Sequence, residues 1–373
     1  IANKYGAVNL SQGFPDFNPP KQITDRLSEV ASEGPHQYAL TWGAKNFRDA
    51  IAAKYEHFSG IKVEPESEIV VTCGSTEAMM ATMLSITNPK DKVVIFSPFY
   101  ENYGADTILS GAEPIYVPLV PPDFTFSIEQ LENAFKQGAK ALILCNPSNP
   151  CGKVFTFEEL TAIADVVKKY DAYVVTDEVY EHIVYAPNKH IYMQALDGMR
   201  ERTIVCNSLS KTYSITGWRL GYVIANPEII DRVKKVHDFL TVGAAAPLME
   251  AATVGLKFDD KYYDELAAHY AHMKEVFVGG LEKLGLKYTD PQGAYYVLVD
   301  VSEFGVKDDV KFCEWMAQYV GVAAVPGSSF FREDVHNLVR FHFAKQDDTL
   351  NEAIKRLATL KEKAMNATDV DWR

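Results

Sequence analysis

The sequence has no excess of positive charge and no long apolar run. Its 373 residues include 37 Lys and Arg against 50 Asp and Glu, which gives a formal net charge of −13. Nucleic acids and anionic membranes are bound through clustered Lys and Arg, so this balance argues against both as partners. No apolar run reaches the ~18 residues of a membrane-spanning helix. The composition leaves room for a small anionic ligand held by a few local cations.

Cysteine is scarce and follows no pattern. The five cysteines are scattered and no C-x-x-C occurs, which argues against a disulfide framework or a zinc site. From Ile1 onward the sequence shows no signal-peptide pattern. We therefore expect reduced thiols, no bound metal and a cytoplasmic location.

Short β-branched runs alternate with amphipathic segments between about residues 68 and 225. The runs are nearly continuous apolar strings, which is typical of strands covered on both faces. They are Ile69–Thr72, Val93–Ser97, Pro114–Val117, Ala141–Cys145, Tyr173–Thr176, Thr203–Cys206 and Leu220–Ala225. Helices are predicted over Thr76–Thr87 and Phe157–Tyr170, the second capped by Thr156 with Glu159 three residues later. The pattern predicts an α/β fold, in three α/β/α layers around a mostly parallel, seven-stranded sheet.

Two further features concern the organisation of the chain. The connection from Asn207 to Gly217 is too short for a helical crossover, so the strand Leu220–Ala225 is expected to run antiparallel. After about residue 255 the pattern changes to that of a smaller α+β unit. Its predicted elements are helix Lys261–Gly285, strand Tyr295–Val301, helix Asp308–Val320, strand Leu338–Phe343 and helix Asp348–Ala364. We predict a large ligand-binding domain over residues 19–265 and a small domain built from residues 1–18 and 266–373.

Polar and aromatic residues follow five predicted strands at their carboxyl ends, where ligands bind in open α/β sheets. Gly74, Ser75 and Thr76 form a small-residue turn that opens a helix, whose free N–H groups suit an anion. The turn is neither a G-x-G-x-x-G motif nor a P-loop, which argues against a dinucleotide or ATP. The other strand ends supply the aromatic Tyr100, the amide Asn149, the carboxylate Asp177, and Lys211 with Arg219 eight residues on.

One ligand uses all five of these features. A lysine in a desolvated, cation-rich pocket becomes a good imine-forming nucleophile, and a buried carboxylate needs a cation or a protonated nitrogen beside it. Pyridoxal 5′-phosphate offers an aldehyde for the lysine, a pyridinium nitrogen for the carboxylate, a ring for stacking, a phenolic oxygen and a phosphate. The strand ends therefore predict this cofactor.

The chain resembles the fold-type-I, class I pyridoxal-phosphate aminotransferases, in the aspartate aminotransferase superfamily, from Leu10 to its C-terminal helix. The motifs that carry the resemblance are Ser208-x-Ser210-Lys211 with Gly217-x-Arg219-x-Gly221, Asn146-Pro147-x-Asn149-Pro150-x-Gly152, and Asp177-Glu178-Val179-Tyr180. The segment Ser11-Gln12-Gly13-Phe14-Pro15-Asp16 is similar to the branch that holds the kynurenine, glutamine and methionine aminotransferases. The resemblance implies ping-pong transfer of an amino group between an L-amino acid and a 2-oxo acid, through an aldimine on Lys211.

The resemblance also implies roles for individual residues. Lys211, Asp177 and Tyr180 would be catalytic: Lys211 moves the proton, Asp177 keeps the ring nitrogen protonated, and Tyr180 with Asn149 holds the phenolic oxygen. The remaining cofactor contacts would come from Gly74, Ser75, Thr76, Tyr100, Ser208 and Arg219. Tyr38 would reach the phosphate of a neighbouring subunit, which implies a homodimer with shared active sites.

The substrate side is implied by the same resemblance. Arg340 would grip the substrate α-carboxylate as a bidentate pair, with Gly13, Asn149, Phe14 and Tyr103 around it. Phe14, Tyr103, Phe330 and Phe331 favour a sizeable neutral, aromatic or sulfur-containing side chain. Kynurenine-type enzymes carry an aromatic-histidine pair where this chain has the small residues Gly243 to Ala246 before Pro247, which argues against kynurenine itself.

Two alternatives share these motifs. A β-lyase acting on cysteine conjugates or cystathionine needs the same Lys211, Asp177 and Arg340, and would release ammonia and pyruvate without an oxo acid. A non-catalytic regulatory protein of the same fold is disfavoured by the intact Lys211 and the complete set of cofactor contacts.

Overall fold

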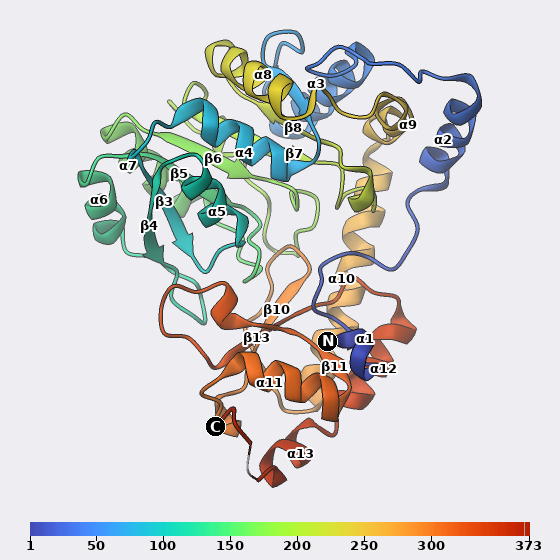
Figure 1. The fold of residues 1–373 in the computed structure, drawn as a ribbon, viewed down its shortest axis with the longest axis vertical. Helices are drawn as coiled ribbons and strands as arrows, with labels where there is room; N and C mark the ends of the chain where they lie inside the picture. The colour runs from blue at the N-terminus through green and yellow to red at the C-terminus, as the bar shows by residue number, and fades with distance from the viewer. Residues whose placement is uncertain (369) are drawn as a thin grey trace.

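A seven-stranded sheet forms the centre of the larger part of the molecule (Figure 1). In the computed structural model, which describes residues 1–368 and 370–373, the strand order is β2-β8-β7-β6-β5-β3-β4. The strands are β2 (Ile69–Thr72), β3 (Lys92–Ser97), β4 (Glu113–Pro118), β5 (Ala139–Cys145), β6 (Tyr173–Asp177), β7 (Thr203–Ser208) and β8 (Gly221–Ile224). Neighbours are parallel except β8, which is antiparallel to both β2 and β7. The predicted α/β class, the mostly parallel sheet and its antiparallel strand are confirmed.

Helices cover both faces of this sheet because successive strand residues point to opposite sides. Val93 and Ile95 of β3 share a core with α4 (Ser75–Ile86), α5 (Asn102–Leu109) and α8 (Pro227–Thr241). Val94 and Phe96 of the same strand pack on the other face, with α6 (Ile128–Lys136) and α7 (Phe157–Lys169). That face is completed by α3 (Lys45–Ser59) and α9 (Ala246–Leu256), and α2 (Lys21–Glu33) packs on α9.

The start of α7 shows how the local sequence defines a boundary. The Thr156 side chain accepts from the Glu159 N–H at 3.2 Å, and the Glu159 carboxylate accepts from the Thr156 N–H at 3.0 Å. This reciprocal pair satisfies two N–H groups that the helix leaves free, and confirms the predicted cap.

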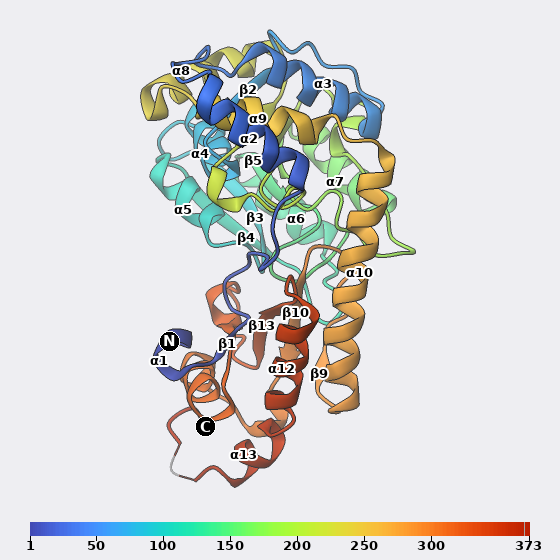
Figure 2. The same ribbon diagram turned by 90° about the vertical axis from the view of Figure 1, so that its right-hand side faces the viewer.

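The smaller part is an α+β unit made from both ends of the chain (Figure 2). Its antiparallel sheet has the order β12-β13-β10-β9, from β12 (Val325–Pro326), β13 (Leu338–His342), β10 (Tyr296–Asp300) and β9 (Lys287–Tyr288). The N-terminal helix α1 (Ala2–Tyr5) and strand β1 (Val8–Asn9) lie here too, with β1 parallel to β11 (Val322–Ala323). This pairing joins the N-terminal segment to the smaller part, while the domain boundaries at residues 18 and 265 remain a prediction. The long helix α10 (Asp260–Lys283) runs alongside both parts.

Two predicted helices of the smaller part differ from those observed. The helix expected over Asp308–Val320 is α11 (Asp309–Trp315), followed by a π-helical turn at Met316–Val320. The helix expected over Asp348–Ala364 is two helices, α12 (Asp347–Leu357) and α13 (Leu360–Asn366). Leu350, Leu357, Leu360 and Ala364 all reach one core, and the break between the helices lets α13 change direction while burying them. Among the described residues, no helix is long and apolar enough to cross a membrane.

Candidate active site

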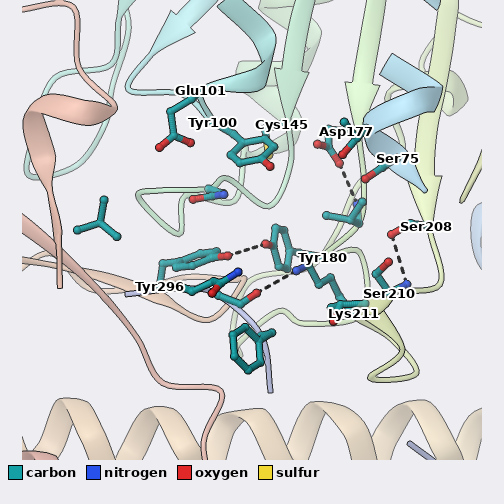
Figure 3. A pocket seen from close by; sticks show the side chains of 18 of the residues that line it. Ser75, Tyr100, Glu101, Cys145, Asp177, Tyr180, Ser208, Ser210, Lys211 and Tyr296 are labelled. Carbon is teal, nitrogen blue, oxygen red and sulfur yellow. Dashed lines mark hydrogen bonds between the residues drawn. The ribbon is translucent and has the colours of Figure 1, made fainter. Parts of the chain in front are cut away.

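A cavity of about 570 Å³ opens where the carboxyl ends of the parallel strands meet the smaller part (Figure 3). Its lining comes from the strand ends, the N-terminus of α4, the segment before residue 15, and the strands of the smaller part. The lining residues that the sequence predicted are Gly13, Phe14, Ser75, Thr76, Tyr100, Tyr103, Asn149, Asp177, Tyr180, Ser208, Lys211, Arg219 and Arg340. Segments far apart in sequence thus converge on one cavity.

Asp177 presents a buried carboxylate at the end of β6. Its Oδ2 accepts from the Tyr103 hydroxyl at 2.7 Å, and its Oδ1 accepts from the Val179 N–H at 3.3 Å. Burial raises the pKa of Asp177, while these two hydrogen bonds favour its charged form. Such a group can hold a protonated nitrogen, since an opposite charge relieves the cost of burying the carboxylate.

Lys211 faces the same cavity from the loop after β7. Its Nζ donates to the Gly13 carbonyl at 3.1 Å and lies 5.9 Å from the centre of the Tyr180 ring. Burial lowers the pKa of Lys211, and the charges of Arg219 and Arg340 act in the same direction. A lysine with a lowered pKa carries more of the neutral amine that attacks a carbonyl carbon.

The α4 end of the cavity is formed by Ser75, Thr76, Ser208 and Arg219, with Gly74 directly behind them. Gly74 has a φ of +86° directly before the helix, and a Cβ there would lie only 2.4 Å from Arg219 Nη2. Arg219 itself adopts left-handed backbone with a φ of 54°, and its Nη1 donates to the Thr216 carbonyl at 2.8 Å. Free helix N–H groups and a guanidinium therefore lie side by side, which suits an anion.

The β13 end of the cavity is formed by Ser11, Asn149, Tyr296 and Arg340. Arg340 is 6% exposed, and its Nη1 donates to Asn149 Oδ1 at 2.7 Å while its Nη2 donates to the Ser11 carbonyl at 3.1 Å. The guanidinium lies 4.3 Å from the Tyr296 ring and 4.4 Å from the Phe330 ring. Arg340 Nε has no hydrogen-bond partner among the described residues. This oriented guanidinium can bind a carboxylate through two parallel hydrogen bonds.

Some predicted site residues lie elsewhere. Tyr38 is 88% exposed and does not line the cavity, so its contact with a neighbouring subunit stays a prediction. Gly74 lies behind the lining and supports Arg219. The expectation that Phe330 and Phe331 form the pocket wall was wrong, because both are buried in the core on the α6 and α7 face of the sheet. Phe330 instead packs against Arg340.

Sequence reasoning assigned no site role to ten lining residues, which are Ser11, Gln12, Glu101, Cys145, Val179, Ser210, Thr216, Gly217, Tyr296 and Val325. The Tyr296 hydroxyl lies 3.0 Å from that of Tyr180, so it contacts the centre of the site. It begins an apolar strand and looked like a core residue. Glu101 directly follows Tyr100, and its position beside a predicted ring-stacking residue was a usable signal.

Comparison with known proteins agrees with this geometry. A family model described as "Aminotransferase class I and II" matches residues 5–357. The chain is 36% identical to a probable N-succinyldiaminopimelate aminotransferase, DapC, of Mycobacterium tuberculosis, over 97% of this chain and 94% of the relative. It is 35% identical to methionine aminotransferase of Escherichia coli, over 96% of this chain and 94% of the relative. It is 35% identical to kynurenine–oxoglutarate transaminase 3 of Bos taurus, over 95% of this chain and 85% of the relative.

Solved structures give the same result. The structure of N-succinyldiaminopimelate aminotransferase from Mycobacterium tuberculosis superposes with a TM-score of 0.93 at 36% identity, covering 96% of this chain and 94% of the other. The Escherichia coli protein YbdL, described as having a methionine aminotransferase function, superposes with a TM-score of 0.93 at 34% identity, with coverage of 96% and 94%. The sequence motifs, the fold and these relatives agree: the chain belongs to the class I and II aminotransferase family.

Proposed function

We propose that this aminotransferase uses pyridoxal 5′-phosphate to exchange an amino group between an L-amino acid and a 2-oxo acid. The observation that carries the proposal is the arrangement of Lys211, Asp177 and two arginines around one cavity. Class I aminotransferases use this cofactor, and the lining offers a partner for each of its polar groups.

Three features of the cavity fit the cofactor. Asp177 is a buried acid without a cation among its hydrogen-bond partners, as a protonated ring nitrogen requires. The Ser210 hydroxyl beside Ser208 is buried and has no partner within the described residues, so it is available to hydrogen-bond a ligand in the cavity. A side chain at Gly74 would collide with Arg219, so the anion-binding turn depends on this glycine. Ser75, Thr76, Ser208 and Arg219 would hold the phosphate, Tyr100 the ring face, and Tyr180 with Asn149 the phenolic oxygen.

The bound cofactor would supply an electron sink that acidifies the Cα proton of the amino acid. Lys211 would then take this proton and return it, because its lowered pKa leaves a neutral amine as base. Arg340 orients the α-carboxylate, and Asn149 accepts from Arg340 through its oxygen, which leaves its NH₂ group free to donate into the cavity.

We propose substrates with a sizeable neutral, aromatic or sulfur-containing side chain. The charged residues of the lining are Lys211, Arg219 and Arg340 against Asp177 and Glu101. Once the three cations hold the cofactor and the α-carboxylate, no cation among the described lining residues remains for an acidic side chain. Phe14 and Val325 add apolar wall, and the relatives' names include methionine and kynurenine enzymes.

We further propose a cytoplasmic homodimer with shared active sites. Tyr38 and Leu40 are exposed on one segment, and Phe239, Leu240 and Val242 are exposed at the end of α8. The Thr41 carbonyl, which accepts from His237, brings these two segments next to each other. Large exposed apolar patches of this kind mark contacts between proteins. All five cysteines are free, which suits a reducing compartment.

A panel of half-reactions tests this function. The purified protein is mixed with methionine, glutamine, phenylalanine, kynurenine, diaminopimelate or aspartate, and the visible absorption of bound pyridoxal phosphate is followed. We expect fast bleaching with one or more of the neutral and aromatic donors, and slow bleaching with aspartate. Release of ammonia and pyruvate from cysteine conjugates without an oxo acid would instead support the β-lyase.

A further inference from the structure

His237 lies fully buried near the end of α8, where neither the cofactor nor the substrate would touch it. Its Nδ1 lies 2.5 Å from Glu77 Oε1, and its Nε2 lies 2.8 Å from the Thr41 carbonyl oxygen. A carbonyl oxygen and an ionised carboxylate only accept hydrogen bonds, whereas a neutral imidazole has a single N–H. Both contacts are satisfied together only when the ring carries two protons.

Both carboxylate oxygens of Glu77 accept further hydrogen bonds. Its Oε2 accepts from the Cys73 N–H, and its Oε1 accepts from the Thr241 hydroxyl at 3.1 Å. These two donors hold the Glu77 side chain in place. Cys73 immediately precedes Gly74, so the pair of His237 and Glu77 braces the turn that opens α4 and forms the predicted phosphate site.

The Thr41 contact braces a second segment. Directly after Thr41, the Trp42 carbonyl accepts from the Val71 N–H at 3.0 Å, and the Gly43 carbonyl accepts from Arg48 Nε at 3.0 Å. Three consecutive carbonyls are thus fixed to α8, β2 and α3. Tyr38 stands three residues before this fixed stretch and projects from the molecule.

We propose that His237, as a cation, is a positioning residue that ties the phosphate-binding turn of its own subunit to the segment carrying Tyr38. One side chain then supports both the phosphate site of this subunit and the residue offered to its neighbour. The inference rests on the proposed cofactor and dimer, and assigns His237 and Glu77 a role that their burial alone does not require.

The charges around His237 define its pH response. Burial lowers the pKa of His237, but the hydrogen bond and charge of Glu77 outweigh burial, with help from Thr41 and Asp238, and the pKa is raised. Cys73 after β2 and Lys234 on α8 are further titratable groups on the elements packed here, and Lys234 Nζ lies 4.8 Å from the centre of the Trp42 ring. Because the pKa is raised, His237 is doubly protonated at low pH and contacts both Glu77 and Thr41. One of these two hydrogen bonds is lost as pH rises through the folded-state pKa.

The test compares His237→Gln with His272→Gln, a control histidine on α10 whose partner is Asp347 on α12. The probe is pyridoxamine 5′-phosphate, which carries the same phosphate but cannot form an imine with Lys211. Its Kd is measured from pH 6 to pH 9 by equilibrium dialysis, together with the dimer dissociation constant.

We expect wild type and His272→Gln to bind the probe more weakly as pH rises. We expect His237→Gln to bind about tenfold more weakly at low pH, the loss typical of one charge-assisted hydrogen bond, and to show a flatter pH profile. Equal affinity and an equal pH profile in wild type and His237→Gln would overturn the inference. If wild type itself failed to bind the probe, the proposed function would fail instead.

A second variant covers the case in which His237→Gln does not fold. Glu77→Gln keeps the shape of the side chain and removes its charge, so the imidazolium loses its main stabilisation. We expect the pH-dependent loss of probe affinity to move to lower pH in this variant. An unmoved profile would contradict the pairing of Glu77 with His237.

Discussion

The two ends of the cavity each hold an arginine, but in different surroundings. Arg219, at the α4 end, is exposed and shares its task with helix N–H groups and hydroxyls. Arg340, at the β13 end, is buried between the rings of Tyr296 and Phe330 and fixed by Asn149 and Ser11. Figure 3 shows Ser75 and Ser208 of the first end opposite Tyr296 of the second.

This difference matches what each end would bind. In the proposed function the cofactor phosphate would stay through the whole catalytic cycle, so many modest contacts, some from backbone N–H groups, would be able to hold it. The substrate α-carboxylate would arrive and leave in every half-reaction, so one oriented, buried guanidinium would have to recognise it. Losing one residue should therefore cost more at the β13 end than at the α4 end.

The largest effect should come from Lys211, which lies between the two ends. We expect Lys211→Ala to lower kcat by at least about 10³-fold, because no other lining amine can move the Cα proton. Both ends should still bind their groups, so the variant should retain pyridoxamine 5′-phosphate in equilibrium dialysis. Full turnover in this variant would refute the assigned mechanism.

Replacing Arg340 should cause the second largest loss of activity. We expect Arg340→Ala to lower kcat/KM for the amino acid by about 10²- to 10³-fold, since a buried charge partner is lost. Arg340→Lys should recover little of this, because an ammonium group cannot bind a carboxylate in bidentate fashion. Steady-state kinetics give the loss, and cofactor affinity should remain close to that of wild type. Loss of cofactor instead would show that Arg340 belongs to the phosphate site.

Replacing Arg219 should have a smaller effect, and it tests directly whether the α4 end depends less on one residue than the β13 end does. We expect Arg219→Ala to weaken cofactor binding by about tenfold while kcat at saturating cofactor changes little, because Ser75, Thr76 and Ser208 remain. Cofactor titration measures this change. If the variant lost more free energy of binding than Arg340→Ala, the contrast between a distributed and a concentrated site would be wrong.

The smallest effect concerns Asp106, on α5 one turn after Tyr103. Burial raises its pKa to about 7, with the charge of Asp177 adding to the shift. The folded state therefore holds this proton more tightly than the unfolded chain, and Asp106 costs stability as pH rises from about 4 to about 7. We expect Asp106→Asn to melt a few degrees higher than wild type at pH 8. Thermal melts at several pH values should show that the difference in melting temperature between the variant and wild type shrinks towards pH 4.

The sheet was predictable from sequence because its signals are local. Continuous apolar runs such as Val93–Ser97 mark covered strands, and the short link from Asn207 to Gly217 permits only an antiparallel return. The site residues directly after these strands could then be predicted as well, since the carboxyl ends of parallel strands lie at one edge of the sheet. Lys211, Asp177, Asn149 and Arg219 were found in this way.

Features that depend on packing between distant segments could not be predicted. Tyr296 reaches the site only because β10 lies against the strand ends, and nothing in its apolar run indicates this. Phe331 is aromatic and close to Arg340 in sequence, but the turn at Gly327–Ser329 directs it into the core. The break between α12 and α13 contains neither glycine nor proline at Ala358 and Thr359, so only the shared core explains it.

The pairing of β1 with β11 has a consequence for how the protein is made. Ser11 and Arg340, which meet at the β13 end, are 329 positions apart in the chain. During synthesis Ser11 leaves the ribosome long before Arg340, so the β13 end of the cavity cannot form until β13 has emerged. The central sheet and the α4 end can be complete long before that. On the proposed function, a nascent chain would thus be able to hold its cofactor before it could recognise a substrate.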